Sequence, residues 1–442
     1  MEWSRYTCTR VREGWVAVFH ELHPVPLYIR ADHWIEVVSE PLVSAYAIEL
    51  LERKLLVRGA EDDDAELARV KRQLMDKLSV PLVLYLILAQ GCNFACGYCP
   101  IPRLPEAEQA ARLSVEDACA GLSLWAEHLT ATPEQDHYII FYGGEPLLNK
   151  ATFYASLEEI RRLQEAGRLS ATRTHLMLAT NGTLIDDEVI AICLERDVLV
   201  ALGIDGPKRV NDRLRIYADG RGTFDDILGM LQKLQARGVR TAVSASLTPY
   251  SLHALRELSE LLQSVGVSKF GLNFLKGRAV LELLSESDRA NFTQASVAAV
   301  LRRHEECADG GYEYQVEKKM KAFAEQDFFP LDCTCYGNQL VIRADGQVSN
   351  CPFFNARFGQ VRDLPLTFRV WQTDTVKLWR GRSSLEHAVF RGDDTKALSG
   401  TGCAWSAIDC GENVLSPDEV TTRFSQAMFE RLIWLNWKGD EV

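Results

Sequence analysis

Six short apolar runs alternate with amphipathic segments through the middle of this 442-residue chain. Segments between them, such as 153–167 and 224–238, repeat their apolar residues with helical spacing. Near-continuous apolar strands separated by amphipathic helices are typical of a parallel sheet covered by helices. The sequence therefore predicts an α/β fold in which six strand–helix units form a partial (β/α)6 barrel. The six runs lie at 80–92, 137–146, 174–183, 198–207, 240–249 and 269–277.

The same layout places the polar motifs of the chain. In a parallel barrel, the loops that leave the C-terminal ends of the strands meet at one mouth. The segments "GCNFACGYC", "GGEP", "TNGT" and "GIDGP" each follow a predicted strand. We therefore expect these four segments to face one cavity.

Composition and charge exclude several classes of partner. A net charge of -12 and a pI near 5.4 give no electrostatic case for binding nucleic acid or an anionic membrane. The apolar stretch at 80–89 is too short to span a bilayer, and "MEWSRYTCTR" lacks the features of a signal peptide. The sequence predicts a cytoplasmic protein with no nucleic-acid or membrane partner.

Eight of the twelve cysteines form two groups, and disulfides are rare in a reducing compartment, so the groups indicate metal binding. Cys92, Cys96 and Cys99 form the first group. Three thiols on one loop can ligate three irons of a cubane and leave the fourth iron open to a small molecule. A zinc site completed by a distant residue is the alternative. The second group comprises Cys333, Cys335, Cys351, Cys403 and Cys410.

The stretch "CNFACGYC" resembles the signature of the radical S-adenosylmethionine (radical SAM) superfamily, and the resemblance extends over residues 80–310. It implies that Cys92, Cys96 and Cys99 hold a [4Fe–4S] cluster whose open iron binds S-adenosylmethionine. One electron from the cluster would cleave the sulfonium and yield a 5′-deoxyadenosyl radical that abstracts hydrogen from the substrate.

The resemblance also assigns the residues that bind the cosubstrate. Gly143, Gly144 and Glu145 are expected at its ammonium group, Asn181 near the ribose, Tyr98 near the adenine and Arg215 at the carboxylate. A core aromatic is the alternative role for Tyr98. The stretch "GIDGPKRVNDRLR" departs from the related motif because Gly203 replaces Ser and Asn211 replaces His. No residue is identified as a catalytic acid or base.

The second cysteine group resembles an auxiliary-cluster domain of the SPASM type or its shortened twitch form. In "CTCYGNQLVIRADGQVSNCPFF" the Asp-Gly pair predicts a hairpin that brings Cys335 and Cys351 onto neighbouring strands. A full SPASM domain has seven cysteines and two clusters. With five cysteines we expect one auxiliary [4Fe–4S] cluster held by four of them. The spacing leaves open whether Cys333 or Cys335 ligates, and a structural zinc site is the alternative.

We expect three domains, at 1–78, 79–310 and 311–442. The first contains a predicted hairpin at 12–30, a helical pair at 42–59 and a helix at 60–78. This order resembles the winged-helix element of ribosomal-peptide (RiPP) maturases, which captures a precursor's leader by strand addition. A packing cap on the barrel is the alternative.

These resemblances predict an enzyme that modifies a ribosomally made precursor peptide by a cross-link or related oxidation. Its partners would be the precursor with its leader and an external reductant such as flavodoxin or ferredoxin. One alternative is anaerobic sulfatase maturation, although Pro352 stands where those enzymes carry an acidic residue. Oxidation or epimerisation of a sugar alcohol is another. A non-catalytic iron–sulfur sensor or electron carrier is the alternative outside enzymes.

Overall fold

The computed structural model describes residues 1–130, 132, 134–267, 270–306, 313–353, 356–390, 393–395 and 397–437. Its centre is an eight-stranded sheet with the order β11-β10-β9-β8-β7-β6-β12-β13. Neighbours from β11 to β6 pair in parallel, as the sequence predicts. All six predicted strands are confirmed: β6 (Val83–Ala89), β7 (His137–Gly143), β8 (Thr174–Thr180), β9 (Val198–Gly203), β10 (Thr241–Leu247) and β11 (Phe270–Phe274).

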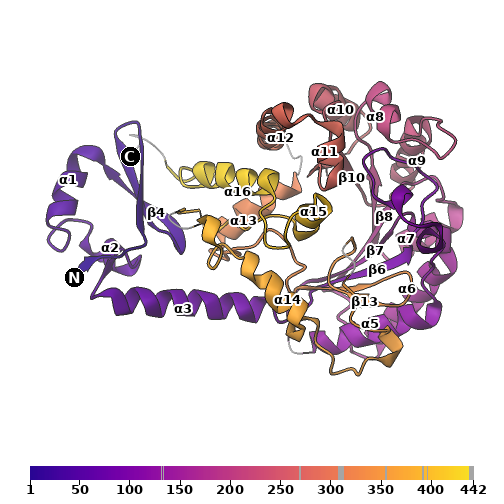
Figure 1. Ribbon diagram of the computed structural model, residues 1–442, viewed down its shortest axis with the longest axis horizontal. Coiled ribbons are helices and arrows are strands. Elements are labelled where there is room, and N and C mark those ends of the chain that lie inside the picture. The colour runs from indigo at the N-terminus through magenta and orange to yellow at the C-terminus, as the bar shows by residue number, and fades with distance from the viewer. Residues whose placement is uncertain are drawn as a thin grey trace.

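Helices cover the outer face of this sheet (Figure 1). Outward-facing strand residues such as Leu84 and Leu86 share one buried core with helix residues such as Trp125. The alternate residue Tyr85 faces inward and is half-buried. Alternation of this kind follows from the two-residue period of a strand. The outer helices are α5 (Val115–Leu129), α6 (Lys150–Glu165), α7 (Asp187–Glu195), α8 (Lys208–Leu214), α9 (Phe224–Ala236) and α10 (Leu255–Ser264).

Helices from the last third of the chain lie between the sheet and the N-terminal region (Figure 1). None of the helices in the described ranges combines the length and the apolar character that crossing a bilayer requires. The remaining helices outside the N-terminal region are α4 (Glu106–Gln109), α11 (Arg278–Leu283), α12 (Glu286–Glu306), α13 (Tyr314–Ala324), α14 (Asp374–Trp379), α15 (Ala404–Asp409) and α16 (Glu419–Leu432).

The predicted Asp-Gly hairpin is confirmed, and it joins the central sheet. It consists of β12 (Gln339–Ile342) and β13 (Val348–Ser349), with Gly346 at a φ of 75° in the turn. Strand β12 pairs in parallel with β6, from Gln339 opposite Val83 to Ile342 opposite Leu86. This pairing covers backbone groups that an edge strand would leave exposed. The sheet of the barrel thus continues into the C-terminal part of the chain.

The N-terminal region holds a three-stranded antiparallel sheet of β2 (Thr7–Arg12), β3 (Trp15–His20) and β4 (His23–Arg30). The predicted hairpin is therefore confirmed and gains a third strand. Of the helical pair predicted at 42–59 only the first helix forms, because the buried residues Leu56 and Val57 form strand β5 against β1 (Glu2–Trp3). The helices of this region are α1 (Ala31–Ser39), α2 (Ala47–Glu52) and α3 (Ala60–Lys77), and α3 runs back toward the sheet (Figure 1).

Helix α5 packs against β12 through Gly121. A Cβ at this position would lie 2.5 Å from Cγ1 of Ile342. We expect Gly121→Ala to lower the free energy of unfolding by about 1–2 kcal/mol, because overpacking outweighs the gain in helix propensity. Thermal and urea unfolding would measure the change.

The matched control is Gly229→Ala on α9, where an added Cβ meets nothing within 4 Å. This variant should be neutral or more stable by up to about 1 kcal/mol, because alanine favours helix over glycine. Equal effects of the two substitutions would contradict the assigned packing.

Candidate functional site

The first cysteine group lies on the loop that leaves β6. Cys92, Cys96 and Cys99 are all half-buried. The pKa of Cys92 is raised to about 12, mainly by burial and partly by the neighbouring Glu145 and the other two thiols, and burial raises the pKa of Cys96 to about 11. The three thiols are thus near enough to affect one another. Thiolates are the ligands that iron–sulfur clusters take, so this donor set fits the predicted cluster.

The described part of the chain contains no site where three His, Cys, Asp or Glu side chains converge closely enough to hold a single metal ion. In an iron–sulfur cluster each thiolate binds a different iron, so its ligands stand further apart than those of a mononuclear site.

Backbone hydrogen bonds hold the cysteine loop against the segment that carries Arg215. The amide of Ala95 donates to the carbonyl of Ile216, and the amide of Gly97 donates to that of Leu214, both at 2.8 Å. Two ladder bonds of this kind fix the relative position of the two segments. The structure therefore brings the first thiol group beside the predicted carboxylate-binding arginine.

Asn181 links the turn after β8 to the same loop. Its amide nitrogen donates to Oδ1 of Asn93 at 2.7 Å and lies 3.8 Å from Sγ of Cys92. Asn93 in turn donates to the hydroxyl of Thr183 at 2.9 Å. Asn93 and Thr183 were not singled out from the sequence, although both stand inside quoted motifs.

Gly143 and Gly144 make room for the chain that enters the cysteine loop. A Cβ on Gly143 would lie 2.1 Å from the carbonyl oxygen of Ala89, and a Cβ on Gly144 would lie 2.3 Å from that of Gly91. The amides of Gly144 and Glu145 donate to these carbonyls at 2.9 Å. The first use of the two glycines is thus a close approach of two backbone segments.

Glu145 is fully buried and holds the same junction. Its carboxylate accepts hydrogen bonds from the amide of Leu147 at 2.9 Å, the hydroxyl of Thr180 at 2.7 Å and the amide of Asn181 at 2.8 Å. Burial raises the pKa of Glu145, and these hydrogen bonds oppose the rise. The carboxylate thereby ties the end of β7 to the end of β8, beside the thiol loop.

Tyr98, Asp205 and Arg215 form a buried polar cluster. The hydroxyl of Tyr98 donates to Asp205, and Nε of Arg215 lies 3.2 Å from the same carboxylate. The Asp205 carboxylate also accepts a hydrogen bond from the backbone amide of Ser246 at 2.8 Å. Burial lowers the pKa of Arg215, but the Asp205 carboxylate and Tyr98 outweigh it and leave the pKa well above its usual value. The ring of Tyr98 packs near Leu275, Ala279 and Leu284.

Gly203 explains one departure from the related motif. A Cβ at this position would lie 2.4 Å from Nη2 and 2.7 Å from Cζ of Arg215, so the guanidinium occupies the space of a side chain. Asn211, which replaces the histidine of the related motif, accepts a hydrogen bond from the backbone amide of Asp205 at 3.2 Å. Asp205 is the residue that sequence reasoning missed, although the quoted "GIDGP" contains it.

Four of the five C-terminal cysteines come together around the β12–β13 hairpin. Cys335 precedes the hairpin and Cys351 follows it, and both are buried. Burial raises the pKa of Cys335 well above its usual value, and the neighbouring thiols of Cys333, Cys351 and Cys403 add to the rise. We call Cys333, Cys335, Cys351 and Cys403 the four-thiol site. Four thiols are the usual ligand set of a cubane.

Cys410 lies apart from this site. It caps the C-terminal end of α15, whereas Cys403 caps its N-terminal end. Seven residues along a helix correspond to roughly 10 Å. Burial and the Asp409 and Asp418 carboxylates raise the pKa of Cys410. The structure thus brings four of the five predicted ligands together, with both Cys333 and Cys335 among them, and places Cys410 elsewhere.

A groove of about 550 Å³ opens between the N-terminal region and later segments of the chain. His23 and Val25 of the outer strand β4 and Val70 and Gln73 of α3 line it, together with residues 326–328. The buried Glu66 accepts hydrogen bonds from His23, Lys54 and Arg69, three residues that line the groove. Burial raises the pKa of Glu66, but these partners outweigh it and lower the pKa to about 2. The ion cluster ties β4 to α3 beside the groove.

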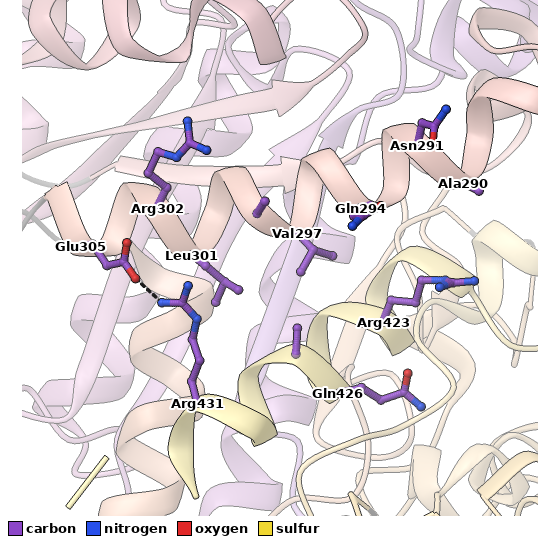
Figure 2. A pocket seen from close by; sticks show the side chains of 12 residues that line it. Ala290, Asn291, Gln294, Val297, Leu301, Arg302, Glu305, Arg423, Gln426 and Arg431 are labelled. Atoms are coloured by element: carbon purple, nitrogen blue, oxygen red, sulfur yellow. Dashed lines mark hydrogen bonds and ion pairs between the residues drawn. The ribbon is translucent and has the colours of Figure 1, made fainter. Parts of the chain in front are cut away.

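A second groove, of about 690 Å³, runs between α12 and α16 (Figure 2). Figure 2 shows Arg431 of α16 reaching Glu305 of α12, while Arg423 and Gln426 extend from α16 into the groove. On another side of α16, Ser425 contacts the segment before Cys333 through Asp332. Helix α16 therefore separates this groove from the four-thiol site.

Residues 86–262 match the model of the radical SAM superfamily. The chain contains a radical SAM domain. A cysteine-type anaerobic sulfatase-maturating enzyme of Clostridium perfringens is 29% identical over 140 residues, which are 31% of this chain and 36% of that enzyme. The match thus spans about a third of the relative's length.

Two solved structures share the fold. Native anSMEcpe with bound AdoMet and Cp18Cys peptide has a TM-score of 0.64 at 18% identity, over 80% of this chain and 98% of that one. Streptococcus suis SuiB bound to precursor peptide SuiA has a TM-score of 0.51 at 13% identity, over 95% of this chain and 99% of that one. The predicted fold class is confirmed for the radical SAM domain and its sheet.

The buried pair of Asp205 and Arg215 generates a stability prediction. Their side chains are 4% and 13% exposed. Asp205→Asn leaves the guanidinium buried without its counter-charge, which costs about 3–5 kcal/mol of unfolding free energy. Urea unfolding would measure the loss.

The matched control is Asp219→Asn, which removes the partner of Arg221 in a pair whose side chains are 56% and 69% exposed. A surface pair contributes about 0–1 kcal/mol, so this variant should unfold almost as the parent does. A loss below about 1 kcal/mol in Asp205→Asn would show that the buried pair is not needed for stability.

Proposed function

We propose that this protein is a radical SAM enzyme that modifies a ribosomally made precursor peptide by a cross-link or related oxidation. The observation that carries the proposal is the combination of two thiol sites with a groove beside an outer strand in one chain. The first thiol group supports the radical chemistry, the four-thiol site supports the handling of a second electron, and the groove supports capture of a peptide.

Cys92, Cys96 and Cys99 would hold the [4Fe–4S] cluster. When bound there with S-adenosylmethionine, the cluster supplies one electron that cleaves the sulfonium and yields a 5′-deoxyadenosyl radical able to abstract hydrogen. The chain's own contribution is to bind and orient the cosubstrate and to exclude water around the radical.

The polar residues around the first thiol group suit that binding task. The guanidinium of Arg215, oriented by Asp205, would pair with the cosubstrate carboxylate through charge-assisted hydrogen bonds. Glu145, Gly143 and Gly144 would receive the ammonium group. Asn181 would lie near the ribose, and Tyr98 near the adenine.

The four-thiol site would hold one auxiliary [4Fe–4S] cluster. Hydrogen abstraction leaves a carbon radical, and formation of a closed-shell cross-link then requires loss of one more electron and one proton, which together make up the second hydrogen lost; the proton would be released to solvent. A cluster within the same chain would accept that electron and pass it to an external carrier such as flavodoxin or ferredoxin.

The groove beside β4 supports a peptide substrate. β4 is an outer strand of its sheet, and outer strands can pair with an added peptide strand. Pro24 and Pro26 lack an amide hydrogen, so we expect strand pairing at 27–30 and side-chain contacts near His23 and Val25. In the SuiB structure cited above, the protein is bound to precursor peptide SuiA, which agrees with a peptide ligand for this architecture.

Sulfatase maturation is the second candidate, favoured by the similarity to the Clostridium perfringens enzyme. It would act on a cysteine or serine of a sulfatase, the two types that the names of such relatives state. Pro352 follows Cys351 and cannot accept a proton, so this candidate needs a base from elsewhere in the chain. For this reason we place it second.

An anaerobic assay tests the proposal as a whole. Reconstituted protein is mixed with S-adenosylmethionine, a strong reductant and a short peptide encoded beside its gene, and a cysteine-containing sulfatase peptide is assayed in parallel. We expect 5′-deoxyadenosine and a product peptide that has lost two hydrogens. Intact S-adenosylmethionine would overturn the radical chemistry, and modification of the sulfatase peptide alone would replace the substrate assignment.

The same assay includes Arg215→Lys. A lysine cannot reproduce the bidentate contact of a guanidinium, so we expect binding of S-adenosylmethionine to weaken about 10–100-fold. The matched control is Arg213→Lys, whose side chain is exposed and lies over the Tyr250 ring at 3.8 Å. Equal affinities of the two variants would remove Arg215 from the binding site.

Iron analysis tests the choice of auxiliary ligands. Cys403→Ser removes one thiol of the four-thiol site, so we expect iron to fall from about eight to about four per chain. Cys410→Ser should keep about eight irons. If Cys410→Ser loses the iron and Cys403→Ser keeps it, the ligand set is wrong. Zinc in place of iron would identify a structural site.

A further inference from the structure

The segment that carries Cys403 is held by an arginine with no exposed surface. Nη2 of Arg382 donates to the carbonyl of Thr401 at 2.5 Å, and Nε donates to the hydroxyl of Tyr336 at 3.0 Å. Tyr336 donates onward to the carbonyl of Gly402 at 3.2 Å. Tyr336 directly follows Cys335, so these bonds connect two cysteines of the four-thiol site through their neighbours.

Asp332 makes the corresponding connection for Cys333, which follows it. Its buried carboxylate accepts hydrogen bonds from the amides of Gly400 and Gly402 at 2.9 and 3.2 Å. It also accepts hydrogen bonds from Nζ of Lys319 and from the hydroxyl of Ser425, both at 2.9 Å. One carboxylate thereby joins the Cys333 segment, the Cys403 segment, α13 and α16.

Close backbone packing provides a second, independent observation. A Cβ on Gly400 would lie 2.7 Å from Cα of Leu331 and 2.9 Å from the amide nitrogen of Asp332. Gly402 has a φ of 72°, in the left-handed region that favours glycine. The amide of Asp418 also donates to the carbonyl of Thr401 at 2.7 Å. The 400–402 segment is thus pressed against 331–332 and fixed there from both sides.

A buried guanidinium and a buried carboxylate are costly unless their hydrogen-bonding capacity is used. Arg382 uses its donors on backbone carbonyls and one phenol, including the carbonyl of Ser416 at 2.8 Å. Asp332 has one lysine partner and three neutral donors. Both charges therefore serve to fix loops, and the loops they fix are those that carry the ligands.

We propose that Arg382 and Asp332 are positioning residues of the four-thiol site, which set the places of Cys403 and Cys333 before any cluster is bound. This inference rests on the proposed auxiliary cluster. It goes further because it states that the ligand loops are preorganised by the chain and do not fold around the metal. Residues that orient metal ligands affect metal affinity almost as strongly as the ligands themselves.

The test uses full-length, anaerobically reconstituted protein with Arg382→Met, which keeps the length of the side chain and removes its donors. We expect iron to fall from about eight to about four per chain. The electron paramagnetic resonance signal that responds to S-adenosylmethionine should remain, and the auxiliary signal should be lost or altered. Arg382→Lys, which retains a positive donor, should restore part of the iron.

The matched control is Arg303→Met. Arg303 is 4% exposed and lies over the Phe270 ring at 5.0 Å, away from the contacts described for the cysteine segments. This variant should keep about eight irons and both signals. Equal loss of iron in the two variants would show a general effect of removing a buried arginine and would overturn the proposal.

Asp332→Asn is the second variant, for use where Arg382→Met does not fold. Its control is Asp63→Asn, a buried carboxylate in the N-terminal region that accepts a hydrogen bond from the hydroxyl of Ser4 at 2.6 Å. We expect auxiliary iron to be lost only from Asp332→Asn. Full iron and an unchanged spectrum in Arg382→Met would overturn the positioning role but not the auxiliary cluster. Where Arg382→Met does not fold, the same result in Asp332→Asn would overturn it. About four irons in the parent protein would overturn the auxiliary cluster and this inference together.

Discussion

Strand β6 pairs with β7 on one side and with β12 on the other, and this double pairing sets where both thiol sites lie. The C-terminal end of β6 leads directly into Cys92. Its first residue, Val83, pairs with Gln339, four residues after Cys335. A seven-residue strand spans roughly 20 Å, so one rigid element relates the two sites. A shift of β12 by one residue would turn its buried side chains to the other face and move the second site.

Close approaches of backbone and side chain complete the first site. Gly143 and Gly144 admit the chain that precedes Cys92, and Gly203 admits the guanidinium of Arg215. The guanidinium is then held by Asp205, and the turn that carries Asp205 is held by Asn211. The two departures from the related motif thus belong to one local arrangement. The glycine leaves space for the guanidinium, and the asparagine holds the backbone of Asp205, whose carboxylate pairs with that guanidinium.

Much of the fold could be predicted from the sequence because the periodicity of apolar residues and the spacing of turn residues are local signals. The six strands and the Asp-Gly hairpin follow from apolar runs and turn residues. The second helix of the pair expected at 42–59 was wrong because Leu56 and Val57 are buried against β1, a pairing with residues more than fifty positions away. Pairing between distant segments also explains why the continuation of the sheet into β12 could not be read from the local pattern.

The residues of the candidate site also fall into those that the sequence reveals and those that only the fold reveals. Motif spacing singled out every cysteine of the two groups, and the family resemblance added Arg215 and Asn181. It could not separate Cys403 from Cys410, because that choice depends on α15 lying between them. It also passed over Asp205, Asp332 and Arg382, since a lone charged residue in a sequence is usually a solvated surface group. Their burial becomes evident only when the distant chain segments that contact them are in place.

The two thiol sites differ in a way that matches the two roles proposed for them. The first offers three half-buried thiols on a loop beside a buried arginine, with no fourth thiol of that group in the sequence, so a ligand can complete the coordination. The second offers four thiols, with Cys335 and Cys351 buried, and its loops are tied down by charged groups that themselves avoid solvent. An open coordination position suits chemistry on a bound molecule, and a closed set suits a group that is held in place. Because Asp332 and Arg382 act only on the closed set, loss of either should leave the first site able to bind its cosubstrate.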